Sequence, residues 1–170
     1  MNIRVANKRD ARGVAKVHID AWKVCYKGIV PDLYLDSFDY AERTKLWEKG
    51  LCDESQFNFI AEQDQEIIGW VTFGLNRDKR SEDIFEIYGI YVLPEHWGSN
   101  VGESLFTSAM KKIEIKSPKT VTLWVLEENI RARIFYQKYG FKLDGVTEKI
   151  KIGGKDLTEI RYEKTYAQQV

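Results

Sequence analysis

The segment from residue 84 to 102, IFEIYGIYVLPEHWGSNVG, constrains the fold most strongly. An apolar run that carries one carboxylate stops at Pro94, and a glycine-containing loop then leads into a helical pattern. The first N–H groups of a helix have no partner inside the helix, and they readily bind anions. The segment therefore predicts a strand, a loop and a helix that together hold the diphosphate of a nucleotide-bearing cofactor.

The helix is predicted to begin near Asn100 or Val101. Its apolar residues recur at helical spacing and give it one apolar face: Val101, Leu105, Phe106, Ala109, Met110 and Ile113. No lysine or arginine occurs between Pro94 and Lys111. A phosphate here would be held by backbone N–H groups and the helix dipole, with the Ser99 hydroxyl as a further donor. A turn that serves structure alone is the alternative, because glycine and asparagine also suit such turns.

Apolar periodicity and turn residues predict the other elements. Helices are expected at residues 10–26, over a second stretch that ends near Gly50, and at 129–139, where Gly140 follows in the usual left-handed position. Strands are expected at residues 3–6, 57–62, 67–75, 84–93, 119–126, 141–152 and 156–165. QDQE (63–66) and Gly153-Gly154 are typical of hairpin turns. This order predicts a single α/β domain, residues 1–170, with a mixed sheet.

Composition excludes several classes of function. The 26 basic and 26 acidic residues cancel, which argues against nucleic acid or an anionic membrane as partner. The two cysteines, Cys25 and Cys52, show neither the spacing of a metal site nor the density of a disulfide scaffold. Neither a signal region nor a long apolar run occurs, so a cytoplasmic location is expected.

The later segment LWVLEENIRARIFYQKYGF, residues 123–141, resembles the GNAT superfamily, the GCN5-related N-acetyltransferases. The family's pattern of an Asn followed by A-x-x-F-Y-x-K-x-G-F matches Asn129, Ala132, Phe135, Tyr136, Lys138, Gly140 and Phe141. Its Q/R-x-x-G-x-G/A loop falls on Trp97 to Gly102, with Trp97 in place of Gln or Arg and Asn100 in place of the first motif glycine. The resemblance covers nearly the whole chain.

The resemblance implies a fold and a cofactor. The fold is a mixed, mostly antiparallel sheet with flanking helices and a splayed pair of neighbouring strands. The pantetheine arm of acetyl-coenzyme A enters between those strands, and Gly89 is consistent with a bulge there that aims an N–H at the thioester oxygen. The cofactor-binding residues that this implies are Tyr91, Val92, Leu93, Trp97, Gly98, Ser99, Asn100, Val101, Gly102, Asn129, Ala132 and Tyr136.

Glu86 is the candidate general base for deprotonating an amine. Its apolar neighbours predict a strand buried on both faces, and burial makes a carboxylate a stronger base. The resemblance supports this role, since many family members have an acidic residue on this strand. The alternative is a carboxylate that is ion-paired at the solvent end of the strand.

Tyr136 is the candidate general acid that protonates the departing thiolate, because a phenol stays protonated at neutral pH. Its place on one helical face with other aromatic residues suits core packing equally, and the family match favours the acid. Asn129, at a helix start, is either an N-cap or a contact of the pantetheine amides, and the two roles are compatible.

The acceptor cleft is implied to lie beneath the first two helices. Trp22, Tyr26 and Tyr34 are candidates for lining it, and Asp32, Asp36 and Asp39 could attract a cationic acceptor or simply form a solvated helix face. Neither cysteine lies beside a histidine, and both are expected far from the motif strands.

The sequence therefore predicts an N-acetyltransferase that moves the acetyl group of acetyl-coenzyme A to a primary amine by direct attack in a ternary complex, without a metal. The acceptor is a small molecule or a peptide, and a homodimer is possible because family members often form one. A coenzyme A-binding module of the same fold without turnover is the main alternative. A structural interaction domain is a second.

Overall fold

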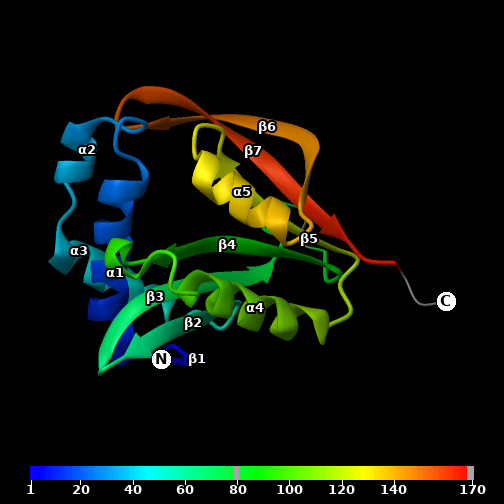
Figure 1. Cartoon of the computed structure of the whole chain (residues 1–170), viewed down its shortest axis with the longest axis horizontal. Coiled ribbons are helices and arrows are strands. Elements are labelled where there is room, and N and C mark those ends of the chain that lie inside the picture. The colour runs from blue at the N-terminus through cyan, green and yellow to red at the C-terminus, as the bar shows by residue number, and fades with distance from the viewer. Residues whose placement is uncertain (79–80, 168–170) are drawn as a thin grey trace.

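The computed structural model describes residues 1–78 and 81–167, and they form one seven-stranded sheet with helices against it (Figure 1). The strand order is β1-β2-β3-β4-β5-β7-β6, in which only β4 and β5 are parallel neighbours. This confirms the predicted mixed, mostly antiparallel sheet. In chain order the elements are β1 (Asn2–Val5), η1 (Lys8–Asp10), α1 (Ala11–Cys25), α2 (Asp32–Asp36), α3 (Tyr40–Gly50), β2 (Gln56–Gln63), β3 (Glu66–Leu75), β4 (Ile84–Val92), η2 (Pro94–His96), α4 (Val101–Glu114), β5 (Thr120–Leu126), α5 (Ile130–Lys138), β6 (Lys142–Ile152) and β7 (Lys155–Thr165).

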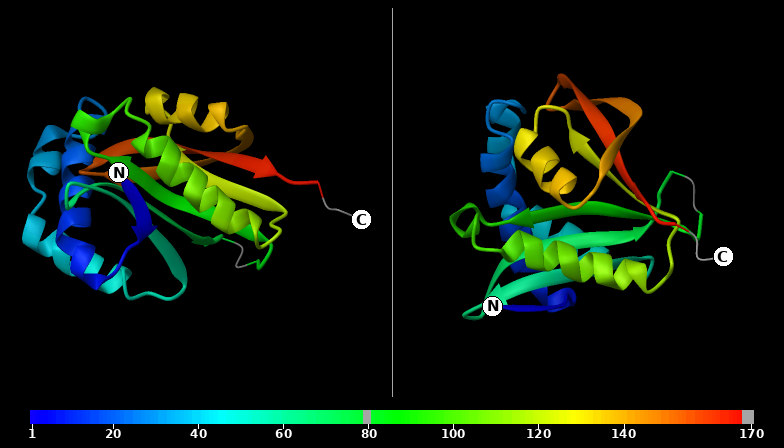
Figure 2. Two further views of the ribbon diagram at one scale, coloured as in Figure 1. Left: turned by 60° about the horizontal axis from the view of Figure 1, so that its bottom comes forward. Right: turned by 45° about the vertical axis from the view of Figure 1, so that its right-hand side comes forward.

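The centre of the first half of the sheet is covered on both faces. Helices α1 and α4 both contact β3 and β4, and they lie on opposite sides of the sheet (Figure 2). Seven consecutive residues of β3, from 68 to 74, are buried as a result. The apolar face predicted for α4 supplies much of this core, because all six of its expected residues are buried.

Turn residues set the hairpins as predicted. Asp64 and Gln65 have φ angles of 51° and 66°, and Gly153 and Gly154 have φ angles of 57° and 82°. Two successive residues with positive φ match the right-handed twist of the strands that they join. The β6–β7 hairpin thereby acquires a fixed register, in which Ile152 lies opposite Lys155 and Glu148 opposite Glu159.

The second helical stretch is not continuous, which corrects the prediction of one stretch to Gly50. A short α2 follows Pro31, and α3 begins only after Asp39, whose backbone is extended at φ −101° and ψ 126°. The Asp39 carboxylate accepts a hydrogen bond from the Glu42 N–H at 2.8 Å and so starts a new helix.

Strands β4 and β5 separate part-way along their length. They pair from Ile84 with Thr120 to Ile87 with Leu123, and no further pairs follow. At this point β4 has a bulge, because Phe73 lies opposite Ile87 whereas Thr72 lies opposite Gly89, which leaves Tyr88 as the extra residue. The predicted bulge and the predicted splayed pair are both confirmed.

Candidate active site

A cavity of about 780 Å³ occupies the space where β4 and β5 separate. Its walls are the second half of β4, the end of β5, the loop from η2 to α4, and the first turns of α5. Helix α1 and the β6–β7 hairpin complete it. The topology thus brings together residues from both ends of the chain, from Trp22 to Glu159.

Most of the predicted site residues line this cavity. They are Trp22, Tyr26, Tyr91, Val92, Trp97, Gly98, Asn100, Val101, Gly102, Asn129, Ala132 and Tyr136. Four predicted residues lie outside its wall: Glu86, Leu93, Ser99 and Tyr34.

Packing explains two of the four exceptions. Leu93 is 1 % exposed in the core, and its N–H donates to the Ile68 carbonyl at 2.9 Å. Tyr34 packs against the β6–β7 hairpin so closely that a Cβ on Gly153 would lie 2.6 Å from the Tyr34 Cβ.

The loop between η2 and α4 has the backbone of an anion site. Gly98 and Asn100 have φ angles of 82° and 63°, and Asn100 immediately precedes the first turn of α4. No side chain caps this helix, so its first N–H groups point into the loop. The Ser99 hydroxyl donates to the His96 carbonyl at 2.6 Å, which leaves it no proton for the phosphate donation that the sequence suggested.

Trp97 holds a fixed position at the rim of the cavity. Its indole N–H donates to the Val92 carbonyl at 2.9 Å, which ties the loop to the end of β4. The opposite side of the rim provides Arg131, whose guanidinium carbon lies 3.8 Å from the centre of the Trp97 ring. A guanidinium stacked this closely on an indole forms a cation–π contact.

Asn129 has the capping role that the sequence offered as one alternative. Its side chain accepts a hydrogen bond from the Ala132 N–H at 3.2 Å and begins α5. It also lines the cavity, so a contact with a bound cofactor is compatible with the cap.

Three tyrosines and one thiol form the inner wall. The Tyr26 and Tyr91 hydroxyl groups share a hydrogen bond of 2.7 Å, and Tyr136 is 7 % exposed. Burial raises the pKa of Tyr26 to about 12 and raises those of Tyr91 and Tyr136 above their usual range. All three phenols therefore keep their protons at neutral pH.

Cys25 also lines the cavity, which corrects the expectation that both cysteines lie far from the motif strands. Burial raises the pKa of its thiol to about 11. Since the thiolate is the nucleophilic form, Cys25 is a poor nucleophile at neutral pH.

Glu86 is buried, as predicted, but it is also ion-paired. It is 1 % exposed, and its carboxylate accepts hydrogen bonds from the Arg77 backbone N–H at 3.1 Å and from the Arg77 Nε at 3.0 Å. The Arg77 terminal nitrogen also contacts the same carboxylate. Arg77 reaches it from the loop that follows β3, and Arg77 itself lines the cavity.

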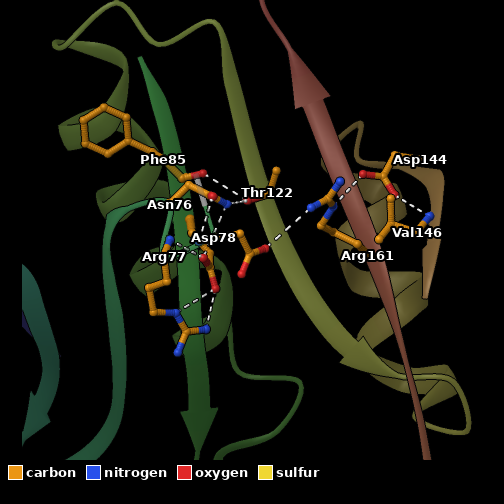
Figure 3. Close-up of polar contacts among 9 residues, drawn as sticks. Asn76, Arg77, Asp78, Phe85, Thr122, Asp144, Val146 and Arg161 are labelled. Carbon is orange, nitrogen blue, oxygen red and sulfur yellow. Dashed lines mark hydrogen bonds and ion pairs between the residues drawn. The ribbon is translucent and has the colours of Figure 1, made fainter. Parts of the chain in front are cut away.

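The loop that follows β3 also contacts strands β5 and β7 in the second half of the sheet. Arg161 on β7 lies between Asp78 and Asp144, with nitrogen–oxygen distances of 3.5 and 2.6 Å (Figure 3). Asn76 at the start of the loop donates to the Thr122 hydroxyl of β5 at 2.9 Å. These contacts hold Arg77 and Asp78 at the cavity.

Four carboxylates that were not predicted line the cavity, those of Asp78, Glu103, Glu148 and Glu159, and the last two form a pair. Glu148 and Glu159 lie directly opposite each other on β6 and β7, and both line the wall. Burial, and then the charge of Glu148, raise the pKa of Glu159 above its ordinary value. The aspartates that the sequence suggested for a cationic acceptor, Asp32, Asp36 and Asp39, do not line the cavity.

A signal for this pair was present in the sequence. Once Gly153 and Gly154 are placed as a two-residue turn, the register follows by counting, and Glu148 then lies opposite Glu159. Only their position beside a cavity required the structure.

The acetyltransferase (GNAT) family matches residues 19–141, which span the cavity walls from α1 to the end of α5. The chain belongs to the GNAT family of acetyltransferases. Its enzyme class is therefore that of the acetyl-coenzyme A-dependent N-acyltransferases, as predicted.

Relatives along the whole chain agree with this assignment. An uncharacterized N-acetyltransferase of Bacillus subtilis, YuaI, is 29 % identical over 95 % of this chain and 96 % of its own. A spermidine N(1)-acetyltransferase of Thermoplasma acidophilum is 24 % identical over 96 % and 98 % of the two chains. The crystal structure of the PaiA N-acetyltransferase from the same organism, in complex with coenzyme A, shares the fold with a TM-score of 0.74, 22 % identity and coverage of 98 % and 100 %.

Two absences complete the description of the site. Among residues 1–78 and 81–167, no three His, Cys, Asp or Glu side chains are grouped to hold a metal ion. Within the same ranges, no helix has the length and apolarity needed to cross a membrane.

Proposed function

We propose that this protein transfers the acetyl group of acetyl-coenzyme A to a primary amine that binds in the same cavity. The observation that carries this proposal is the cavity itself, which runs from the α4 loop into the space between β4 and β5. Support comes from the PaiA structure, which holds coenzyme A, and from a relative that is named for acetylating spermidine.

The cofactor fits the cavity in one direction. Its diphosphate lies at the N–H groups of the first turn of α4, where the helix dipole favours negative charge. Its pantetheine arm lies along Gly89 to Val92, since this edge of β4 has no pairing with β5. The thioester then reaches the bulge, and a backbone N–H there stabilises the developing oxyanion.

The acetyl group moves in one step within a ternary complex. The neutral amine nitrogen attacks the thioester carbonyl carbon, and the carbon–sulfur bond breaks. The coenzyme A thiolate takes a proton from the Tyr136 hydroxyl, and the proton that the nitrogen loses as it becomes an amide restores the Tyr136 phenol. The high pKa of Cys25 supports direct attack over an acyl-enzyme.

The amine must lose a proton before it attacks, and two carboxylates are candidates for accepting it. Glu86, the sequence-based candidate, is bound on both oxygens by Arg77 and does not line the cavity, so its proton would have to travel through water. Glu159 lines the cavity, and its pKa is raised. We propose Glu159 as the direct base, and the Glu86 role stays a prediction.

Release of free thiol from acetyl-coenzyme A tests the function. Purified protein is incubated with acetyl-coenzyme A and a panel of primary amines that includes polyamines, amino sugars and peptides, and the thiol is measured with a colorimetric reagent. Thiol release that depends on one class of amine, with a matching acetylated product by mass spectrometry, supports an enzyme. Binding of coenzyme A without release from any amine would favour the non-catalytic module.

A further inference from the structure

Arg131 occupies an unusual position at the rim of the cavity. It is the second residue of α5, and its guanidinium lies flat enough on Trp97 to bring Cζ within 3.8 Å of the ring centre. The indole is itself fixed by the hydrogen bond from its N–H to the Val92 carbonyl. The stack therefore places a positive charge beside the α4 loop.

The loop lacks positive charge of its own. No lysine or arginine occurs between Pro94 and Lys111, and Trp97 stands where the family pattern has Gln or Arg. Backbone N–H groups, the helix dipole and the side chains of His96 and Asn100 are what this segment offers to a phosphate, since the Ser99 hydroxyl donates to the His96 carbonyl. A diphosphate carries more negative charge than such partial charges balance.

Only two side chains of lysine or arginine line the cavity among the described residues, Arg77 and Arg131. Arg77 is bound to the buried Glu86, which balances its charge. Arg131 forms no ion pair within residues 1–78 and 81–167, and stacking uses only the face of its guanidinium. Its N–H groups lie in the plane and remain able to donate in pairs to phosphate oxygens.

We propose that Arg131, held in place by Trp97, binds the phosphate groups of coenzyme A and replaces the polar side chain that the loop lacks. In this arrangement Trp97, at the motif position, supplies an aromatic surface, and Arg131 of α5 supplies the positive charge. The inference rests on the proposed function, because it takes coenzyme A as the ligand.

Binding of three ligands by Arg131→Gln tests the inference. We expect the Kd of coenzyme A and that of 3′-dephospho-coenzyme A, which keeps the diphosphate, to rise by about tenfold or more, as loss of a charge-assisted hydrogen bond predicts. The affinity for S-acetylpantetheine, which has no diphosphate, stays unchanged. Calorimetry serves for the nucleotides and chemical-shift titration for the weaker ligand.

Salt gives a second readout that a structural defect would not change. The wild-type Kd of coenzyme A rises with salt, and in Arg131→Gln this dependence becomes weaker because one charge–phosphate contact is gone. Trp97→Leu removes the aromatic surface on which Arg131 stacks and keeps the arginine. It is expected to raise the Kd of coenzyme A and to weaken its salt dependence in the same way.

Arg133→Gln is the matched control. Arg133 lies two residues further along α5, binds the Glu127 carbonyl and the Tyr162 hydroxyl, and does not line the cavity. This variant keeps the wild-type Kd of coenzyme A.

Three results would overturn the role of Arg131: an unchanged Kd in Arg131→Gln, an equal loss for S-acetylpantetheine, or an equal loss in Arg133→Gln. Failure of the proposed function looks different, because the wild-type protein would then not bind coenzyme A at all.

Discussion

Single residues around the cavity owe their chemistry to burial. Tyr26, Tyr91, Tyr136 and Cys25 all have a raised pKa because they are removed from water, so each is neutral at physiological pH. A neutral phenol holds a proton ready for the thiolate that leaves.

Tyr136→Phe is expected to lower turnover by about 100-fold, the usual effect of losing a general acid, while the Kd of coenzyme A changes little. Steady-state rates and calorimetry measure the two quantities. Tyr139→Phe is the control, because Tyr139 lies on the same helix end and outside the cavity wall. Equal turnover of wild type and Tyr136→Phe would show that Tyr136 packs in the core and is not the general acid.

Glu159→Gln is expected to remove the low-pH limb that titration of Glu159 gives to the rate profile, and to leave the dependence on free amine. The base must be deprotonated, so the wild-type rate falls as pH drops through the Glu159 pKa, which lies above the ordinary carboxyl value. The variant is slow at all pH values and gains rate only as free amine increases. kcat/KM measured from pH 5 to 9 tests this.

Two variants complete that experiment. Glu163→Gln, on the same strand and outside the cavity, keeps the wild-type profile. Glu86→Gln keeps the low-pH limb and loses stability, because Arg77 then loses its partner. If the low-pH limb of the rate profile disappears in Glu86→Gln and persists in Glu159→Gln, the base is Glu86.

At the scale of elements, the ion pair between Arg4 and Asp10 joins β1 to the start of α1. Asp10 is 8 % exposed, and its carboxylate accepts hydrogen bonds of 2.8 Å from both terminal nitrogens of Arg4 and from the Asn7 N–H. The guanidinium of Arg4 is the main cause that lowers the pKa of Asp10.

Asp10→Asn is expected to reduce the free energy of unfolding at pH 7 by about 1 to 3 kcal/mol. The lowered pKa means that the stabilisation is complete above the ordinary carboxyl pKa and is lost as pH falls through the Asp10 value. The gap between wild type and variant should therefore close in acid. Urea unfolding at several pH values measures it, and the exposed Asp156→Asn serves as a control with little effect.

Elements were predictable where the signal is local. Hairpin turns at residues 64–65 and 153–154, the end of α5 at Gly140 and the apolar face of α4 all follow from neighbouring residues. The break between α2 and α3 depends on a cap at Asp39 within a polar stretch, where periodicity is weak. Contacts such as Arg131 with Trp97 join positions 34 residues apart (131 − 97), and no local pattern reports them.

For the whole molecule, the separation of β4 and β5 divides the sheet into two parts with few backbone hydrogen bonds between them. Four residue pairs join the strands, and the contacts of Arg161 and the packing of Phe106 against Phe135 add to them. A cofactor bound in the gap contacts both parts and so stabilises the folded chain.

Coenzyme A at a 100-fold excess over its Kd is expected to stabilise the protein by about 2.7 kcal/mol. Amide hydrogen exchange should slow most at residues 88–92 and 124–126, which border the cavity. Slower exchange in α2 and α3 alone would contradict binding in the gap.

The neutral inner wall has a consequence for which nitrogen compounds can react. A cation moving from Glu148 and Glu159 toward the buried Tyr136 leaves its hydration behind and meets the neutral phenols, so only an uncharged nitrogen travels that far. Guanidines, which keep their proton, should therefore stop beside Glu148 and Glu159 and compete with amines without ever being acetylated.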